Sequence, residues 1–266
     1  MNKWILTILM LCVLIMHVLL KRNGRYIEPI PKHVYTYWES DNVKETDFVR
    51  MCMKTWSYHN SDWMFHVISG NNLCEYAPET SKTTRHGKVQ KYADLIRLEV
   101  LERNGGVWLD ASIYMTSSLN WIHDVQRWSE CTLLGFTNPI REEHLMMESW
   151  FIACTAHNEY VREWRAEYMR SYNDTEMYLR NVPEQIKQLV ENPEYLTMNV
   201  CWKRIHERRK DLQPQVHLMS SKYGPFKLQT LSNYNPRQFK KRFDTNKNEV
   251  KPFIKITQIE RQHLLA

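Results

Sequence analysis

Gly105-Gly106-Val107-Trp108-Leu109-Asp110 is the stretch that decides the predicted fold of this chain. The chain has 266 residues but only seven glycines, and two of them stand together here. Glycine is needed where the backbone takes a positive φ angle or passes close to another group. The apolar residues that follow predict a short buried strand, with Asp110 at its carboxyl end. In open α/β sheets, ligands bind at those ends.

The segments around this stretch alternate between helix and strand patterns. Residues 88–103 carry an apolar face at helical spacing, and an Asn-Gly pair ends the predicted helix. Towards the N-terminus, a predicted βαβ unit consists of strand 34–38, helix 47–58 and strand 63–68. Further along the chain, we expect strands at 132–136, 150–154 and 216–219 and helices at 159–172, 183–191 and 200–210. This alternation predicts an α/β domain.

Asp94 and Arg97 lie three residues apart, so they share a face of the predicted helix. Their chain neighbours are apolar, which puts the pair at the edge of a buried stripe rather than on an open polar face. An aspartate there can accept hydrogen bonds from sugar hydroxyls, while the arginine holds it in place or binds a phosphate. The alternative interpretation is a surface ion pair with no ligand.

Asp110 also has two interpretations. A carboxylate at the end of a sheet strand can hold a divalent metal ion that bridges two phosphates, because hard cations prefer carboxylate oxygens. An aspartate that follows a strand is also a common turn residue. The Asp94 and Arg97 pair on the preceding helix favours the ligand-binding interpretation.

Several segments carry a resemblance to a known family. They are Ile30-Pro31-Lys32-His33-Val34-Tyr35-Thr36-Tyr37-Trp38, Ala93-Asp94-Leu95-Ile96-Arg97, Gly105-Gly106-Val107-Trp108-Leu109-Asp110-Ala111-Ser112, Glu148-Ser149-Trp150-Phe151-Ile152-Ala153 and Tyr223-Gly224-Pro225-Phe226. In this order they resemble the DXD-containing sugar-binding glycosyltransferases, closest to their capsular-polysaccharide-synthesis branch. The resemblance implies a GT-A fold, with a Rossmann-like mixed sheet flanked by helices. It also implies a nucleotide-sugar donor, a glycan or other hydroxyl acceptor, a divalent metal (Mn²⁺ or Mg²⁺) and transfer that retains the anomeric configuration.

The resemblance also assigns roles to individual residues. Trp38 matches the aromatic residue that stacks on the base of the donor, although a core aromatic is the alternative. Asp94 and Arg97 match the pair that binds the donor sugar, and Asp110 matches the first acidic residue of the DXD element. These three are the expected catalytic residues. The remaining expected contacts are Gly106 and Trp150 for the donor, with Trp150 equally consistent with a core strand, and Ser112 with Asp110 for the metal.

Ser112 departs from the family pattern, in which the second acidic residue is the direct metal ligand. A serine offers a neutral hydroxyl oxygen to a cation that prefers charge, so metal binding is expected to be weakened. The alternative function is therefore a noncatalytic sugar-nucleotide-binding or scaffold protein with a degenerate DXD element. The Glu148 segment matches a region near the donor and acceptor in the family. His86 and His144 are either ligands or bases, or ordinary structural histidines.

The N-terminus predicts a single-pass membrane anchor. Residues 4–20 form an uncharged apolar run that is long enough for a short span, and no small-residue cleavage site of a signal peptide follows it. The flanking charges place the body on the cytoplasmic side, whereas a Golgi or ER enzyme needs the lumenal side, so sidedness stays open. We expect an anchor at 1–25, a GT-A domain at 26–243 and a polar C-terminal tail at 244–266.

The overall composition excludes several classes of protein. The net charge of +6 comes mainly from late basic clusters without aromatic interleaving or a known nucleic-acid-binding module, so no nucleic acid partner is expected. The cysteines outside the apolar run are widely spaced with no C-x-x-C pair, which indicates neither a zinc site nor a disulfide framework.

Overall fold

The computed structural model describes residues 27–40 and 42–265. Within them, six strands form one sheet in the order β2-β1-β3-β6-β5-β7, and two more strands form a separate ribbon. The strands are β1 (His33–Tyr37), β2 (Met64–Ile68), β3 (Gly106–Leu109), β4 (Ile113–Met115), β5 (Leu133–Thr137), β6 (Met147–Cys154), β7 (Val216–Ser220) and β8 (Phe253–Lys255). The helices are α2 (Val43–His59), α3 (Leu73–Tyr76), α4 (Val89–Asn104), α5 (Trp121–Ser129), α6 (Glu159–Asn173), α7 (Thr175–Arg180), α8 (Glu184–Lys187), α9 (Thr197–Arg208), α10 (Lys227–Leu231), α11 (Pro236–Asn246) and α12 (Gln258–Leu265).

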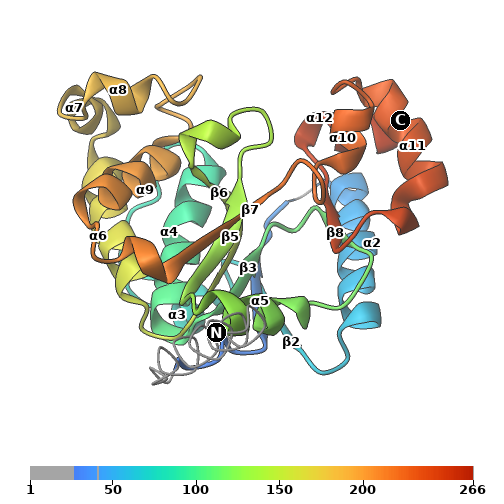
Figure 1. The fold of residues 1–266 in the computed structure, drawn as a ribbon, viewed down its shortest axis with the longest axis horizontal. Coiled ribbons are helices and arrows are strands. Elements are labelled where there is room, and N and C mark those ends of the chain that lie inside the picture. Colours follow the sequence, from blue (N-terminus) through green and yellow to red (C-terminus); the bar gives the residue numbers. More distant parts are fainter. Residues whose placement is uncertain (1–26, 41, 266) are drawn as a thin grey trace, which may run out of the picture.

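The sheet is mixed. Strands β2, β1 and β3 run parallel to one another, β6 is antiparallel to both β3 and β5, and β7 is parallel to β5. Helices α4, α6 and α9 lie together on one side of the sheet, and α2 with the C-terminal helices α10, α11 and α12 lies on the other (Figure 1). This arrangement confirms the predicted α/β class with a mixed sheet flanked by helices.

Two glycines make the turn from α4 into β3. Gly105 has a φ angle of +62° and its N–H donates to the Leu101 carbonyl, which ends the helix. Gly106 has a φ angle of +88°, and a Cβ atom there would lie 2.5 Å from the His33 carbonyl oxygen of β1. Only glycine therefore lets β3 pair closely with β1 directly after the helix.

The core divides into layers on the two sides of the sheet. Between the sheet and α4, α6 and α9, apolar residues such as Leu95, Trp164 and Trp202 are fully buried. On the other side, Trp56 of α2 and Phe151 of β6 belong to a second buried cluster. The apolar stripe of α4 is thus buried as predicted, which fixes that helix behind β1 and β3.

The predicted helix at 183–191 is shorter in the structure. Helix α8 ends at Lys187, and the chain then crosses an irregular segment before α9 begins at Thr197. After α8 the N–H groups of Leu189 and Val190 bond to the carbonyls three residues back, of Ile186 and Lys187, so the chain continues in turns instead of an α-helix.

Residues 244–265, expected to be a polar tail, instead belong to the folded domain. Strand β8 pairs antiparallel with β4, with Lys255 opposite Ile113. Phe253, Ile254 and Ile256 are buried, and α12 packs against α11 and α2. The prediction of a tail rested on the polar residues up to Lys251 and overlooked the short apolar segment that follows. Burial of that segment stabilises the packing of the C-terminal region against the domain.

The predicted membrane anchor at 1–25 lies outside the described residues and stays a prediction. Among residues 27–40 and 42–265, no helix combines the length and the apolar character needed to cross a lipid bilayer.

Candidate active site at the sheet edge

The site residues gather where β1 and β3 end and β6 begins. Trp38 follows β1 and Asp110 follows β3, and because these strands are parallel both residues come to the same edge of the sheet. The antiparallel strand β6 starts at this edge, where the Asp110 N–H donates to the Trp150 carbonyl at 2.9 Å. The topology therefore brings together three of the segments that the sequence singled out.

Asp94, Arg97 and Asp110 form one contact group. Arg97 Nη2 lies 3.3 Å from Asp94 Oδ1 and 3.4 Å from Asp110 Oδ1, and Arg97 Nη1 donates to the Ser149 carbonyl. The Arg97 side chain is 7% exposed, and its guanidinium carbon lies 5.0 Å from the Trp108 ring centroid. The structure thus brings the three predicted catalytic side chains together around a buried guanidinium.

Lys255 joins this group from a distant part of the chain. Its Nζ lies 2.6 Å from Asp110 Oδ2 and 3.4 Å from Ser112 Oγ. Strand β8 delivers the lysine, and the following residue, Ile256, exchanges two hydrogen bonds with Ser112. Sequence analysis missed Lys255. The available signal was a lysine flanked by buried-type residues in Phe253-Ile254-Lys255-Ile256, a pattern that predicts a strand.

The two carboxylates of the group have different protonation behaviour. Burial acts to raise the pKa of Asp110, but Lys255 and Arg97 outweigh it and lower that pKa to about 2. For Asp94, burial is the largest effect and raises the pKa to about 6, although Arg97 acts in the opposite direction. Asp110 is therefore a firmly ionised anion between two cations, whereas Asp94 changes charge near neutral pH.

An open cleft of about 460 Å³ lies over this group, and we call it the sheet-edge cleft. Its volume is within the range of small-molecule sites, about 300–1,000 Å³. The cleft-lining residues used below are Trp38, Arg97, Asp110, Tyr195, Lys255 and Arg261.

Trp38 lines the sheet-edge cleft, and its ring lies 5.6 Å from the guanidinium carbon of Arg261 in α12. Tyr195 closes another part of the cleft and is half exposed. Sequence analysis missed both Arg261 and Tyr195, because each comes from a segment whose position depends on long-range packing.

The other predicted site residues have different surroundings. Gly106 is buried against β1, so its contact is with the sheet. Trp150 is 4% exposed, stacks on Phe136 and belongs to the core cluster, which matches the core-strand alternative. Ser112 lines the cleft, but its hydroxyl donates to the Ile256 carbonyl at 2.8 Å.

The side chains present do not fit a divalent metal at this position. Both Asp110 oxygens are engaged by cationic side chains, and the Ser112 hydroxyl is committed to a backbone carbonyl. In the described part of the chain, no group of three or more histidine, cysteine, aspartate or glutamate residues is arranged to hold a metal ion. A hard cation needs several free oxygen ligands, so this donor set does not supply them. The metal stays a prediction that these side chains do not support.

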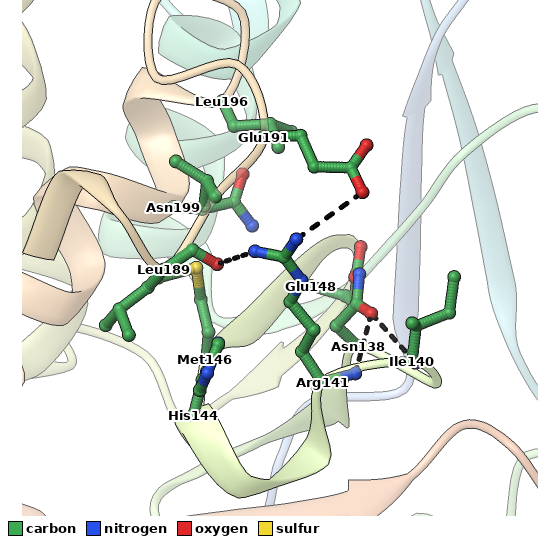
Figure 2. A pocket seen from close by; sticks show the side chains of 11 residues that line it. Asn138, Ile140, Arg141, His144, Met146, Glu148, Leu189, Glu191, Leu196 and Asn199 are labelled. Carbon is green, nitrogen blue, oxygen red and sulfur yellow. Dashed lines mark hydrogen bonds and ion pairs between the residues drawn. The ribbon is translucent and has the colours of Figure 1, made fainter.

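A second, smaller cavity of about 180 Å³ lies beside the first, and we call it the side hollow (Figure 2). Its lining includes Glu148 at the start of β6 and Arg141, which Figure 2 shows bonded to the Leu189 carbonyl and paired with Glu191. Asn138 donates to Glu148 Oε1 at 2.8 Å. Burial raises the pKa of Glu148, and Lys255 and Asp110 both influence it, which puts this carboxyl within electrostatic reach of the sheet-edge cleft.

The two histidines differ in position. His86 is exposed, its backbone N–H donates to the Tyr172 hydroxyl at 3.0 Å, and its ring lies 6.0 Å from the Tyr172 ring. His144 lines the side hollow, and its Nδ1 atom is buried without a hydrogen-bond partner among residues 27–40 and 42–265. His144 is thus the histidine that lines one of the two cavities described above.

Comparison with known proteins identifies similar sequences. The family model described as "Capsular polysaccharide synthesis protein" matches residues 20–249. A protein of Annulohypoxylon truncatum named O-glycosyltransferase braB is 26% identical over 152 residues, which are 50% of this chain and 36% of that protein. The chain therefore spans about a third of the length of this curated relative.

Solved structures give weaker similarities. The apo-form glycosyltransferase GlyE of Streptococcus pneumoniae matches with a TM-score of 0.46 and 14% identity, covering 86% of this chain and 55% of that one. Mouse xyloside xylosyltransferase 1 matches with a TM-score of 0.37 and 8% identity, covering 76% of this chain and 93% of that one.

Proposed function

The chain belongs to the capsular polysaccharide synthesis protein family, and from that membership we propose that it is a glycosyltransferase, which moves a sugar from a nucleotide-sugar donor to a hydroxyl acceptor. The observation that carries the proposal is the group of Asp94, Arg97 and Asp110 beneath a cleft at the sheet edge. Ligand sites of α/β sheets lie at such edges. The named relative, an O-glycosyltransferase, supports the same reaction class.

The sheet-edge cleft is the proposed donor site in a GT-A type domain. Trp38 offers an aromatic surface for the base. Asp94 lies beneath the cleft and is not one of its lining residues. Its side chain is 12% exposed and is held by Arg97 and by the Tyr168 hydroxyl at 3.3 Å, and in the proposal it accepts a hydrogen bond from a sugar hydroxyl when it is ionised. Departure of the sugar leaves additional negative charge on the diphosphate, and cationic side chains fixed beside it stabilise that charge.

The side hollow is the proposed acceptor site. Its mixed lining, with apolar Met146 and Leu196 beside Glu148 and Asn199, suits a sugar, which has both apolar ring faces and hydroxyl groups. Residues of one segment line both cavities, since Tyr195 faces the cleft and Leu196 the hollow. Glu148 is the proposed hydrogen-bond acceptor for the attacking hydroxyl, and its raised pKa suits proton exchange nearer neutral pH.

Retention of the anomeric configuration is part of the proposal. It follows from the resemblance of the motif segments, and no covalent nucleophile is assigned. Proton NMR of the anomeric signal in the first product formed distinguishes retention from inversion.

A transfer assay tests the proposed function. The full chain, purified in detergent, is incubated with a panel of nucleotide sugars and simple glycoside acceptors, and both the released nucleoside diphosphate and the product mass are measured. We expect one donor to give transfer. If a donor binds, as seen by thermal stabilisation, but no panel member is turned over, the noncatalytic sugar-nucleotide-binding alternative replaces the enzyme.

A further inference from the structure

We propose that the Lys255 ammonium group, and not a divalent cation, stabilises the diphosphate that leaves the donor sugar. The inference rests on the proposed glycosyltransferase function and deepens it, because it assigns the charge-stabilising group and makes transfer independent of metal. It starts from the position of one atom. Lys255 Nζ contacts both Asp110 and Ser112, the two residues at which the motif resemblance would put a metal ion.

The fold fixes the Lys255 backbone in this position. In the β4–β8 ribbon Lys255 stands opposite Ile113, directly after the Asp110-Ala111-Ser112 turn. The Lys255 N–H also donates to the Pro225 carbonyl at 3.0 Å. The backbone of Lys255 is therefore fixed by β4 on one side and by the Pro225 carbonyl on the other. The ammonium is a preorganised charge, unlike that of a mobile surface lysine. Its side chain is only 12% exposed and lines the sheet-edge cleft.

The ammonium retains hydrogen-bonding capacity for a ligand. A lysine has three N–H donors, and Lys255 directs one to Asp110 and one, at 3.4 Å, to Ser112. One donor is left for a phosphate oxygen in the cleft. Arg97 also keeps unpaired N–H groups, because its Nη atoms bond only Ser149, Asp94 and Asp110 among the described residues, but its Nε atom is buried and its side chain is 7% exposed against 12% for Lys255. Both cations line the cleft, but only Lys255 contacts both Asp110 and Ser112, so it is the cation that stands at the position expected for the metal.

The reaction balances without a metal ion. The bond between the anomeric carbon and the diphosphate oxygen breaks, and its electron pair stays on that oxygen, where the new negative charge is stabilised by the ammonium. The acceptor oxygen forms the new bond to the anomeric carbon, and its proton passes to a base or to water. Lys255 stays protonated throughout. Asp110, whose carboxylate holds the ammonium, is a positioning residue in this scheme.

Nucleoside diphosphate binding tests the inference separately from transfer. The probes are UDP, GDP and inorganic pyrophosphate, titrated by calorimetry into the full chain in EDTA and again in Mn²⁺ or Mg²⁺. We expect at least one nucleoside diphosphate to bind in EDTA with an affinity that metal changes less than about twofold. Loss of one charge-assisted hydrogen bond makes Lys255→Met weaken this binding about ten- to a hundredfold.

Two further variants keep the test decisive. Lys255→Arg retains the charge and should bind within a few-fold of the wild type, even if Lys255→Met folds poorly. Lys241→Met removes an equal charge from an exposed position of α11 and should leave binding unchanged. Thermal unfolding of all variants separates a local loss of binding from a loss of the fold.

The outcomes separate this inference from the proposed function. Transfer that EDTA abolishes and metal restores, or nucleotide binding that Lys255→Met leaves intact, overturns the assignment of Lys255 while the glycosyltransferase function stands. Metal-independent binding that needs Lys255, without transfer to any acceptor, supports the assignment of Lys255 as the diphosphate-binding cation and argues against the enzyme.

Discussion

Asp110→Asn should both destabilise the folded chain and slow sugar transfer. The Asp110 carboxylate is the shared acceptor of Lys255 and Arg97, at 2.6 and 3.4 Å. Burial alone would raise the pKa of this carboxyl, but the two cations have the larger combined effect, and the pKa falls from 3.8 to about 2. At roughly 1.4 kcal/mol per pKa unit, and allowing for solvent screening of a side chain that is 31% exposed, the ionised carboxylate contributes about 2 kcal/mol to the free energy of unfolding.

The direction of the pH dependence follows from the lowered pKa. The contribution of Asp110 is fully present above the unfolded-chain pKa of 3.8 and is lost as the pH falls towards about 2. The difference in stability between wild type and Asp110→Asn should therefore be constant from neutral pH down to about pH 5, and should shrink below about pH 4. At neutral pH the melting temperature should fall by about 5 °C.

Thermal unfolding followed by tryptophan fluorescence measures the stability, and the transfer assay measures the turnover, which should fall about a hundredfold because the cations lose their fixed position. Asp124→Asn is the matched control. Asp124 pairs with Arg127 on the exposed face of α5, at 3.1 Å, so its loss should cost less than about 0.5 kcal/mol. The reasoning is refuted if the two variants are equally stable and Asp110→Asn transfers sugar at the normal rate.

Three further predictions concern neighbouring residues. Transfer should increase as the pH rises through about 6, because the Asp94 pKa is raised to that value and its carboxylate accepts the sugar hydroxyls; a pH–rate profile of Asp94→Asn should lack this step. The same raised pKa means that protonated Asp94 favours the folded state below pH 3.8, and that this contribution is lost as the pH rises through about 6. Glu148→Gln should raise the acceptor KM or lower kcat about tenfold without changing nucleotide affinity, and weaker UDP binding in calorimetry would argue against an acceptor role. Gly106→Ala should destabilise the chain by about 2 kcal/mol or more through backbone strain and a clash with His33, whereas Gly87→Ala, with a positive φ angle but open space around it, should cost about 1 kcal/mol; equal melting temperatures of the two variants would contradict this.

The part of the site that the sequence predicted comes from local patterns. The apolar stripe of α4 and the Gly105-Gly106 turn are encoded within about twenty consecutive residues, so periodicity and backbone chemistry were enough to relate Asp94 and Arg97 to Asp110. The order of the strands in the sheet was not needed to relate these residues. Helix α4 is followed directly by β3, and such a short connection limits where the strand can lie relative to the helix.

Trp150 shows where such reasoning fails. The motif alone does not distinguish a donor-contacting Trp150 from a core Trp150, because a strand that is covered on both faces buries every side chain. The structure puts Trp150 against Phe136 and Phe226, on the face that supports the β4–β8 ribbon. Trp150 and its neighbour Phe151 both contact Phe253 of this ribbon. The burial of Trp150 therefore depends on the last residues of the chain, and no local pattern reports that.

Lys255 extends the same point to the chemistry of the site. It lies 145 residues from Asp110 in the sequence, and only the pairing of β4 with β8 brings the two together. Taken alone, Ser112 appears as the loss of a metal ligand. Taken with Lys255, it keeps the charge in balance, because the two carboxylates of Asp94 and Asp110, when both are ionised, offset the two cations Arg97 and Lys255. A second acidic residue at position 112 would leave an excess negative charge beside the incoming diphosphate. Ser112 and Lys255 thus set the charge of the site together. Because they lie far apart in the sequence, their relation becomes visible only in the folded structure.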